Sequence, residues 1–108
     1  MFREFRRSTR VSLSVTIQIE GQDDIFAFDG ETIAVNLHGA LVRTAMALLP
    51  NERVVVRVYL TGKQAAARVV HIAPDNALHC GIELDVPQNI WGVPIPPADW
   101  DELQTGRI

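Results

Sequence analysis

Hydrophobic and polar residues alternate along most of the chain. The clearest example is the stretch 11–19, in which every second residue is apolar and the others are serine, threonine or glutamine. This two-residue period predicts one continuous β-strand with a single buried face over 11–19. Similar alternation predicts further strands over 31–35, 40–44, 53–60, 64–72 and 78–84.

Turn-forming residues separate these stretches. Asp29-Gly30 is expected to break the chain between the apolar residues 25–28 and the next strand, which starts at Glu31. Gly39 marks a tight turn or bulge between two strand segments, and Thr61-Gly62 marks a hairpin. The pattern gives six or seven short strands with no helix of useful length between them, which predicts an all-β barrel or sandwich.

The C-terminal part of the chain follows a different pattern. Four prolines exclude regular strands over much of it, and Pro97 with the acidic residues that follow predicts one short helix. Trp91 and Trp100, the only tryptophans, are expected to cap the barrel rather than stack on a ligand. The predicted organisation is a flexible basic arm at 1–10, a barrel at 11–86, and a Pro/Trp-rich segment at 87–108 within the same domain.

Charge is distributed unevenly along the sequence. Four of the ten Lys and Arg residues lie in the first ten positions, whereas the whole chain has a net charge of −3. A basic arm on an acidic body indicates an anionic partner. Because guanidinium groups pair with oxyanions and lie flat on aromatic rings, this arginine cluster favours a partner that carries phosphates or flat rings.

Composition excludes several classes of protein. A hydrophobic content of 47% with 21% charged residues fits one globular domain. No apolar run is long enough to span a membrane, and the N-terminus lacks the apolar core of a secretory signal. A single cysteine, Cys80, excludes an internal disulfide. We therefore expect a cytoplasmic protein without membrane insertion.

Candidate catalytic and metal-binding groups are sparse. The soft-ligand candidates are His38, His71, His79 and Cys80, whose spacing does not match a zinc pattern. No nucleophile motif, phosphate-binding loop or carboxylate pair is present. We expect no enzyme activity, no cofactor and no metal, and we expect Cys80 to be a small core residue.

Two short motifs carry a resemblance to a known family. Arg6-x-x-x-Arg10 precedes the first strand, and a glycine turn ends at Gly39. Together they resemble the bacterial PilZ domains that bind cyclic di-GMP, whose hallmarks are Arg-x-x-x-Arg and then [Asp/Asn]-x-Ser-x-x-Gly. The first motif matches in full. In the second, Ala34 replaces the acidic or amide residue and Asn36 replaces the serine.

The resemblance covers residues 3–86, because 39–42, 67–70 and 80–84 are also similar to family strands. It implies a six-stranded antiparallel β-barrel, the PilZ-like split barrel, with a short C-terminal helix. It also implies a single-domain receptor or adaptor in bacterial second-messenger signalling that binds cyclic di-GMP. The ligand-binding residues it implies are Arg6, Arg7, Arg10, Asn36, His38 and Gly39.

The implied mechanism is a switch in which the ligand orders the arm, and an unidentified protein partner or a second copy of the chain then reads the new surface. One alternative is a degenerate PilZ-like protein-interaction module that does not bind nucleotide, which Ala34 supports. A nucleic-acid polymer is disfavoured as a partner because the body is acidic and its strands carry few aromatic residues. The sequence leaves both outcomes open for Ala34 and Asn36: they abolish ligand binding, or they only weaken it.

Overall fold

The structure, a computed structural model, describes residues 8–22 and 26–100 of the 108-residue chain. This described part contains seven β-strands, and every pairing between them is antiparallel. The strands are β1 (Val11–Ser12), β2 (Thr16–Gly21), β3 (Ala27–Asn36), β4 (Gly39–Thr44), β5 (Arg53–Val58), β6 (Gln64–Ala73) and β7 (Asn76–Leu84).

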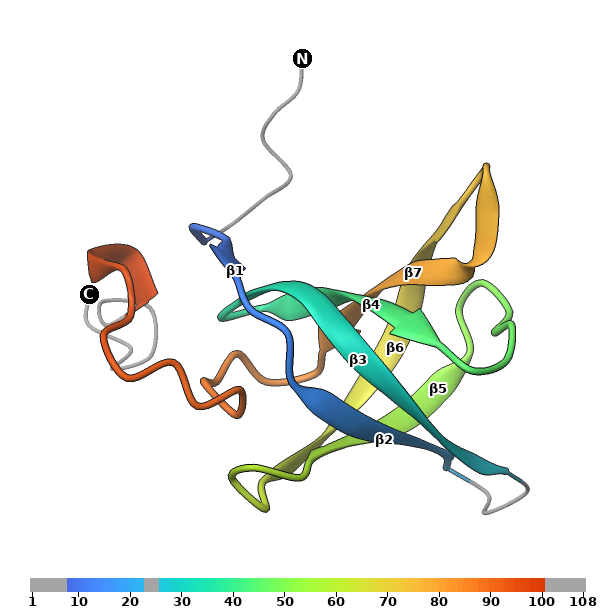
Figure 1. Ribbon diagram of the computed structural model, residues 1–108, viewed down its shortest axis with the longest axis horizontal. Coiled ribbons are helices and arrows are strands. Elements are labelled where there is room, and N and C mark those ends of the chain that lie inside the picture. The colour runs from blue at the N-terminus through green and yellow to red at the C-terminus, as the bar shows by residue number, and fades with distance from the viewer. Residues whose placement is uncertain (1–7, 23–25, 101–108) are drawn as a thin grey trace.

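Six of these strands close into a barrel (Figure 1). Neighbouring strands follow the order β3-β2-β5-β6-β7-β4, and β4 pairs back with β3 to complete the ring. The short strand β1 adds to one end of β3. The predicted six-stranded antiparallel barrel is therefore confirmed, and the sandwich is excluded because the sheet is continuous around the ring.

The predicted alternation fills the inside of the barrel. Ile17 and Ile19 of β2 have no exposed surface, and neither have Val54, Val56 and Val58 of β5. Strands β6 and β7 contribute their own alternate residues to the same core. Cys80 belongs to this core with 1% of its surface exposed, as predicted. Burial raises the pKa of the Cys80 thiol to about 11.

The prediction of one continuous strand over 11–19 is wrong, because the strand is interrupted at residues 13–15. The Thr32 hydroxyl donates a hydrogen bond to the Leu13 carbonyl and accepts one from the Val15 N–H. Ser12 pairs with Ala34 and Thr16 pairs with Glu31, so a step of four residues matches a step of three on β3. The extra residue makes a bulge, which a period-two pattern does not reveal.

The predicted break at Asp29-Gly30 is also wrong, because β3 runs through both residues without interruption. Gly30 pairs with Thr44 of β4, and a Cβ built on it would lie 2.6 Å from the Arg43 carbonyl oxygen. The glycine is thus needed for the close approach of two strands rather than for a turn.

Two of the predicted turns are confirmed. Gly62 lies between β5 and β6 with φ of +72°, a conformation that glycine adopts without strain. Asn36 at the end of β3 pairs with Gly39 at the start of β4, which leaves a two-residue turn between them. A Cβ on Gly39 would collide with the Ile82 carbonyl oxygen, so this position also requires glycine.

The C-terminal segment packs into one end of the core. Figure 1 shows it leaving β7 and passing beside β1. Trp91 and Trp100 have no exposed surface, which confirms that they are buried caps, and Ile90 and Val93 pack with them. Residues 98–100 form a helical turn, and the remainder of the predicted helix lies outside the described residues. In the described ranges no helix has the length and apolarity needed to cross a bilayer.

Candidate functional site

The segment ahead of β1 is fixed to the turn between β3 and β4. Ser8 is 2% exposed, and its hydroxyl oxygen accepts a hydrogen bond from the Leu37 N–H at 3.0 Å. The same oxygen lies 3.1 Å from Nδ1 of His38. The Asn36 amide also donates to the Ser8 carbonyl at 3.3 Å. The two motifs that resemble PilZ signatures therefore meet in space, and Ser8, a residue inside the first motif, joins them.

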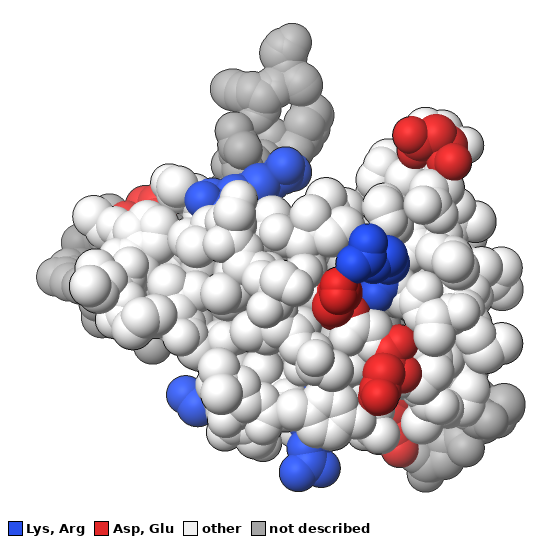
Figure 2. All heavy atoms as spheres, viewed as in Figure 1, with Lys and Arg blue, Asp and Glu red and all other residues white. Residues whose placement is uncertain are grey.

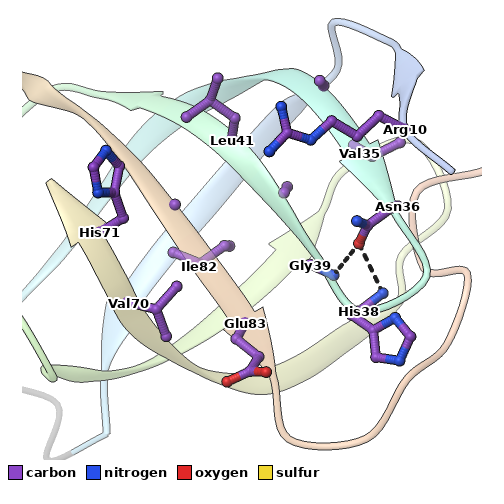
Figure 3. Close-up of a pocket in the computed structure, with 13 residues that line it drawn as sticks. Arg10, Val35, Asn36, His38, Gly39, Leu41, Val70, His71, Ile82 and Glu83 are labelled. Carbon is purple, nitrogen blue, oxygen red and sulfur yellow. Dashed lines mark hydrogen bonds between the residues drawn. The ribbon is translucent and has the colours of Figure 1, made fainter. Parts of the chain in front are cut away.

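Asn36 shapes the turn itself (Figure 3). Its side-chain oxygen accepts hydrogen bonds from the backbone N–H groups of His38 and Gly39, both at 2.9 Å. This is an Asx-type arrangement, in which a side-chain oxygen replaces a backbone acceptor. Asn36 thus uses its carbonyl oxygen inside the turn and presents the rest of the turn in one fixed conformation.

The C-terminal segment supports both parts of the site. The Trp91 indole N–H donates to the Asn36 carbonyl at 2.9 Å, and the Trp100 indole N–H donates to the Thr9 carbonyl at 2.7 Å. The Thr9 N–H and hydroxyl both donate to Asp99 Oδ2 at 2.9 Å. Two of these hydrogen bonds are part-buried and two are exposed, and together they hold Thr9 and the turn against the C-terminal segment.

A pocket of about 360 Å³ opens on the outer face of the barrel beside this turn. Figure 3 shows Arg10 extending over one side of it, with Asn36 and Gly39 at the turn. The register of the strands then places Ala34 beside Leu41, Leu41 beside Gly81, and Gly81 beside His71, all of which line the pocket. Its volume lies in the range of small-molecule sites.

The structure brings together four of the six residues that the resemblance implies. Arg10, Asn36, His38 and Gly39 all line this pocket. Arg6 and Arg7 lie outside the described residues. The binding role of all six stays a prediction.

Other residues that line the pocket were not predicted as ligand contacts, and among them are His71, Gly81 and Glu83. Residues 81 and 83 are two positions apart in a predicted strand, so the sequence places them on the same face. Only the pairing of β4 with β7 places that face beside the turn. No short motif in the sequence reports that pairing. Gly81 could have been noticed from the sequence, because a glycine within a strand often marks a place where a ligand or another backbone approaches closely.

Charge around the pocket is partly balanced. Glu83 contributes a carboxylate to the wall, and Arg68 of β6 donates a hydrogen bond to it at 3.2 Å. This contact offsets negative charge that would otherwise repel an anionic ligand. A neighbouring hollow of about 460 Å³ shares His38 and Glu83 with the pocket, so the two openings adjoin.

On the face drawn in Figure 2, the described Lys and Arg side chains do not form the continuous basic surface that is typical of nucleic-acid binding, because uncharged surface separates them. Ion pairs among the described residues join Arg43 to Glu31 and Arg53 to Asp85. Across residues 8–22 and 26–100, no group of three His, Cys, Asp or Glu residues is arranged to hold a metal ion.

Comparison with known proteins identifies the fold and the family. The sequence profile of the PilZ domain matches residues 2–90. The crystal structure of the PilZ domain of CeSA from a cellulose synthesizing bacterium is similar, with a TM-score of 0.59 and 17% sequence identity. That similarity covers 92% of this chain and 97% of the other, and at this identity it shows a shared fold alone. No curated protein matches the sequence.

Proposed function

The chain belongs to the PilZ domain family, and on that premise we propose that it binds cyclic di-GMP and acts as a single-domain receptor or adaptor in bacterial signalling. PilZ domains are binding modules rather than enzymes. The ligand carries two phosphates and two guanines, so a suitable site must supply cations, hydrogen-bond donors and a surface for flat rings. A protein partner or a second copy of the chain would then recognise the ligand-bound form.

The observation that carries this proposal is the shared pocket of Arg10 and the turn at Asn36–Gly39. An arginine can form paired hydrogen bonds to phosphate oxygens or to the O6/N7 edge of guanine, and it can stack on the purine face. The turn supports the proposal because its conformation is fixed by Asn36, so a ligand would meet it without reordering it.

The anchored position of Ser8 also supports a role for the rest of the arm. Arg6 precedes Ser8 by two residues, a length of chain that spans at most about 7 Å. This short reach supports the proposal that Arg6, Arg7 and Arg10 bind one compact dianion.

Isothermal titration with cyclic di-GMP tests the proposal. We expect the unaltered protein to bind, and we expect Arg6→Ala and Arg10→Ala each to weaken binding about 10- to 100-fold, since each removes a charge-assisted contact. Arg57→Ala is the matched control, because Arg57 is exposed on β5 and does not line the pocket. No heat from the unaltered protein, or equal weakening by Arg57→Ala, would contradict the proposal.

A second candidate is a PilZ-like interaction module that does not bind nucleotide. Two observations favour it. Ala34 places a methyl group in the pocket wall, and the side-chain oxygen of Asn36 is used within the turn. A site without those two polar contacts would bind cyclic di-GMP more weakly. A stable protein partner in pull-down, together with no heat in the titration, would identify this function instead.

A further inference from the structure

Thr9, the residue before Arg10, is held by the C-terminal segment at three of its atoms. Its N–H and its hydroxyl both donate to Asp99 Oδ2 at 2.9 Å, and its carbonyl oxygen accepts a hydrogen bond from the Trp100 indole N–H at 2.7 Å. The backbone donor, the backbone acceptor and the side chain of Thr9 are all bound by two consecutive residues. Contacts on both sides of one residue fix the direction of its backbone as well as its position.

These contacts act where the pairing of strands does not reach. Thr9 and Arg10 are exposed and precede β1. The neighbouring fixed points are Ser8, bound to the Leu37 N–H, and Val11, paired with Val35. Near the end of a chain, exposed residues are ordered only where they are tied to the rest of the protein. Between the two fixed points, Asp99 and Trp100 determine how the chain runs.

The residues that hold Thr9 are themselves firmly placed. Trp100 has no exposed surface and belongs to the hydrophobic core. Its backbone N–H donates to the Pro97 carbonyl at 3.0 Å, which closes the helical turn that carries Asp99. The position of the Asp99 carboxylate therefore follows from packing of the core.

We infer that Asp99 is a positioning residue for the nucleotide site, because through Thr9 it holds Arg10 in the direction that extends over the pocket (Figure 3). The inference rests on the proposed function and adds a residue that does not line the pocket. An arginine that already has its binding direction loses less entropy when the ligand arrives. If this direction is only partly populated, the apparent affinity falls in proportion.

Isothermal titration of Asp99→Ala and Asp99→Asn with cyclic di-GMP tests the inference. Asp99→Ala removes the acceptor of both Thr9 donors, and we expect it to weaken binding about 3- to 10-fold. Asp99→Asn keeps one oxygen that can accept both hydrogen bonds, so its affinity should stay within about twofold of the unaltered protein. Oδ1 makes no hydrogen bond to the described residues, so the amide nitrogen that replaces it loses no contact.

Asp29→Ala is the matched control. It removes the same charge at an exposed position on β3 that does not line the pocket. Loss of a negative charge by itself favours an anionic ligand, so charge alone predicts equal or tighter binding for both alanine variants. Positioning predicts weaker binding for Asp99→Ala alone, and the sign of the change separates the two effects.

Backbone NMR relaxation of the Arg10 amide gives a second readout, which needs no ligand. In the free unaltered protein and in Asp99→Asn this amide should be as rigid as the amides of the strands. In Asp99→Ala it should become mobile on the picosecond-to-nanosecond timescale. Thermal unfolding is recorded for every variant, so that all titrations are made on folded protein.

Each outcome decides the inference. Weaker binding with a mobile Arg10 amide in Asp99→Ala, both restored in Asp99→Asn, is the result that the inference requires. Unchanged affinity or an equally rigid Arg10 amide in Asp99→Ala, or the same weakening in Asp29→Ala, would overturn the inference and leave the proposed function intact. No binding by the unaltered protein would overturn both.

Discussion

Ser8 is the residue on which the geometry of the candidate site depends most. It lies between the two arginines of the arm motif, yet its side chain points into the protein, where it contacts Leu37 and His38. A serine within a cluster of arginines would ordinarily be exposed, since serine is among the residues most often found at the surface. Because Ser8 is buried and hydrogen-bonded to Leu37, the chain that leads into β1 has a fixed position against the β3–β4 turn.

Replacing Ser8 by alanine is expected to lower the free energy of unfolding by about 1–3 kcal/mol, because the buried Leu37 N–H loses its acceptor. Urea denaturation measures the change. Ser14→Ala is the matched control, since Ser14 is exposed, and its effect should stay within about 0.5 kcal/mol. Equal stability of the two variants would mean that the Ser8 contact contributes little.

Cys80 gives a prediction about pH. Burial raises its pKa from 9.0 to about 11, so the unfolded chain loses the thiol proton at lower pH than the folded chain does. The stabilising contribution is therefore complete below pH 9 and is lost as pH rises to about 11, by about 2–3 kcal/mol in total. Urea denaturation across this range, compared with Cys80→Ala, isolates the effect. If the free energy of unfolding changed with pH in the same way in both proteins, the thiol would not contribute to the pH dependence of stability.

At the scale of elements, the alternating pattern located the strands but not their irregularities. Side-chain periodicity reports which face of a strand is buried, so the barrel strands and the buried Cys80 could be predicted. The interruption after Ser12 depends on the Thr32 hydroxyl, which comes from a neighbouring strand. The continuity through Asp29-Gly30 depends on the approach of β4. Both effects arise from tertiary contacts, which no local pattern encodes.

The C-terminal segment is predicted to stabilise the turn through Trp91. Trp91→Phe keeps a buried ring but removes the N–H that donates to the Asn36 carbonyl, so stability should fall by about 1–3 kcal/mol. Affinity for cyclic di-GMP should fall with it, because Asn36 shapes the pocket rim. Urea denaturation and titration measure the two effects.

Tyr59→Phe is the control for this substitution. Tyr59 is 48% exposed, and its hydroxyl donates to Asp29 at an exposed position, so its loss should change stability by less than about 0.5 kcal/mol. If Trp91→Phe were no more destabilising than Tyr59→Phe, the C-terminal segment would not support the turn.

At the scale of the whole molecule, the candidate site depends on closure of the barrel. The arm motif and the β3–β4 turn could be recognised from the local sequence, and the structure places Arg10 and the turn at one pocket. Gly81 and Glu83 reach that pocket only because β7 pairs with β4, although long stretches of chain separate the two strands. Motifs therefore predicted the local half of the site, whereas the half contributed by β6 and β7 depends on the topology.

An NMR titration of the uniformly labelled, unaltered protein with cyclic di-GMP tests the central claim most directly. The amide signals of Arg10, of the turn 36–39 and of Gly81 should shift together at one stoichiometry, while those of Arg57 and Lys63 on the other side of the barrel stay in place. Unchanged signals at saturating ligand, or shifts confined to residues outside this pocket, would contradict the claim that the arm and the glycine turn form one nucleotide site.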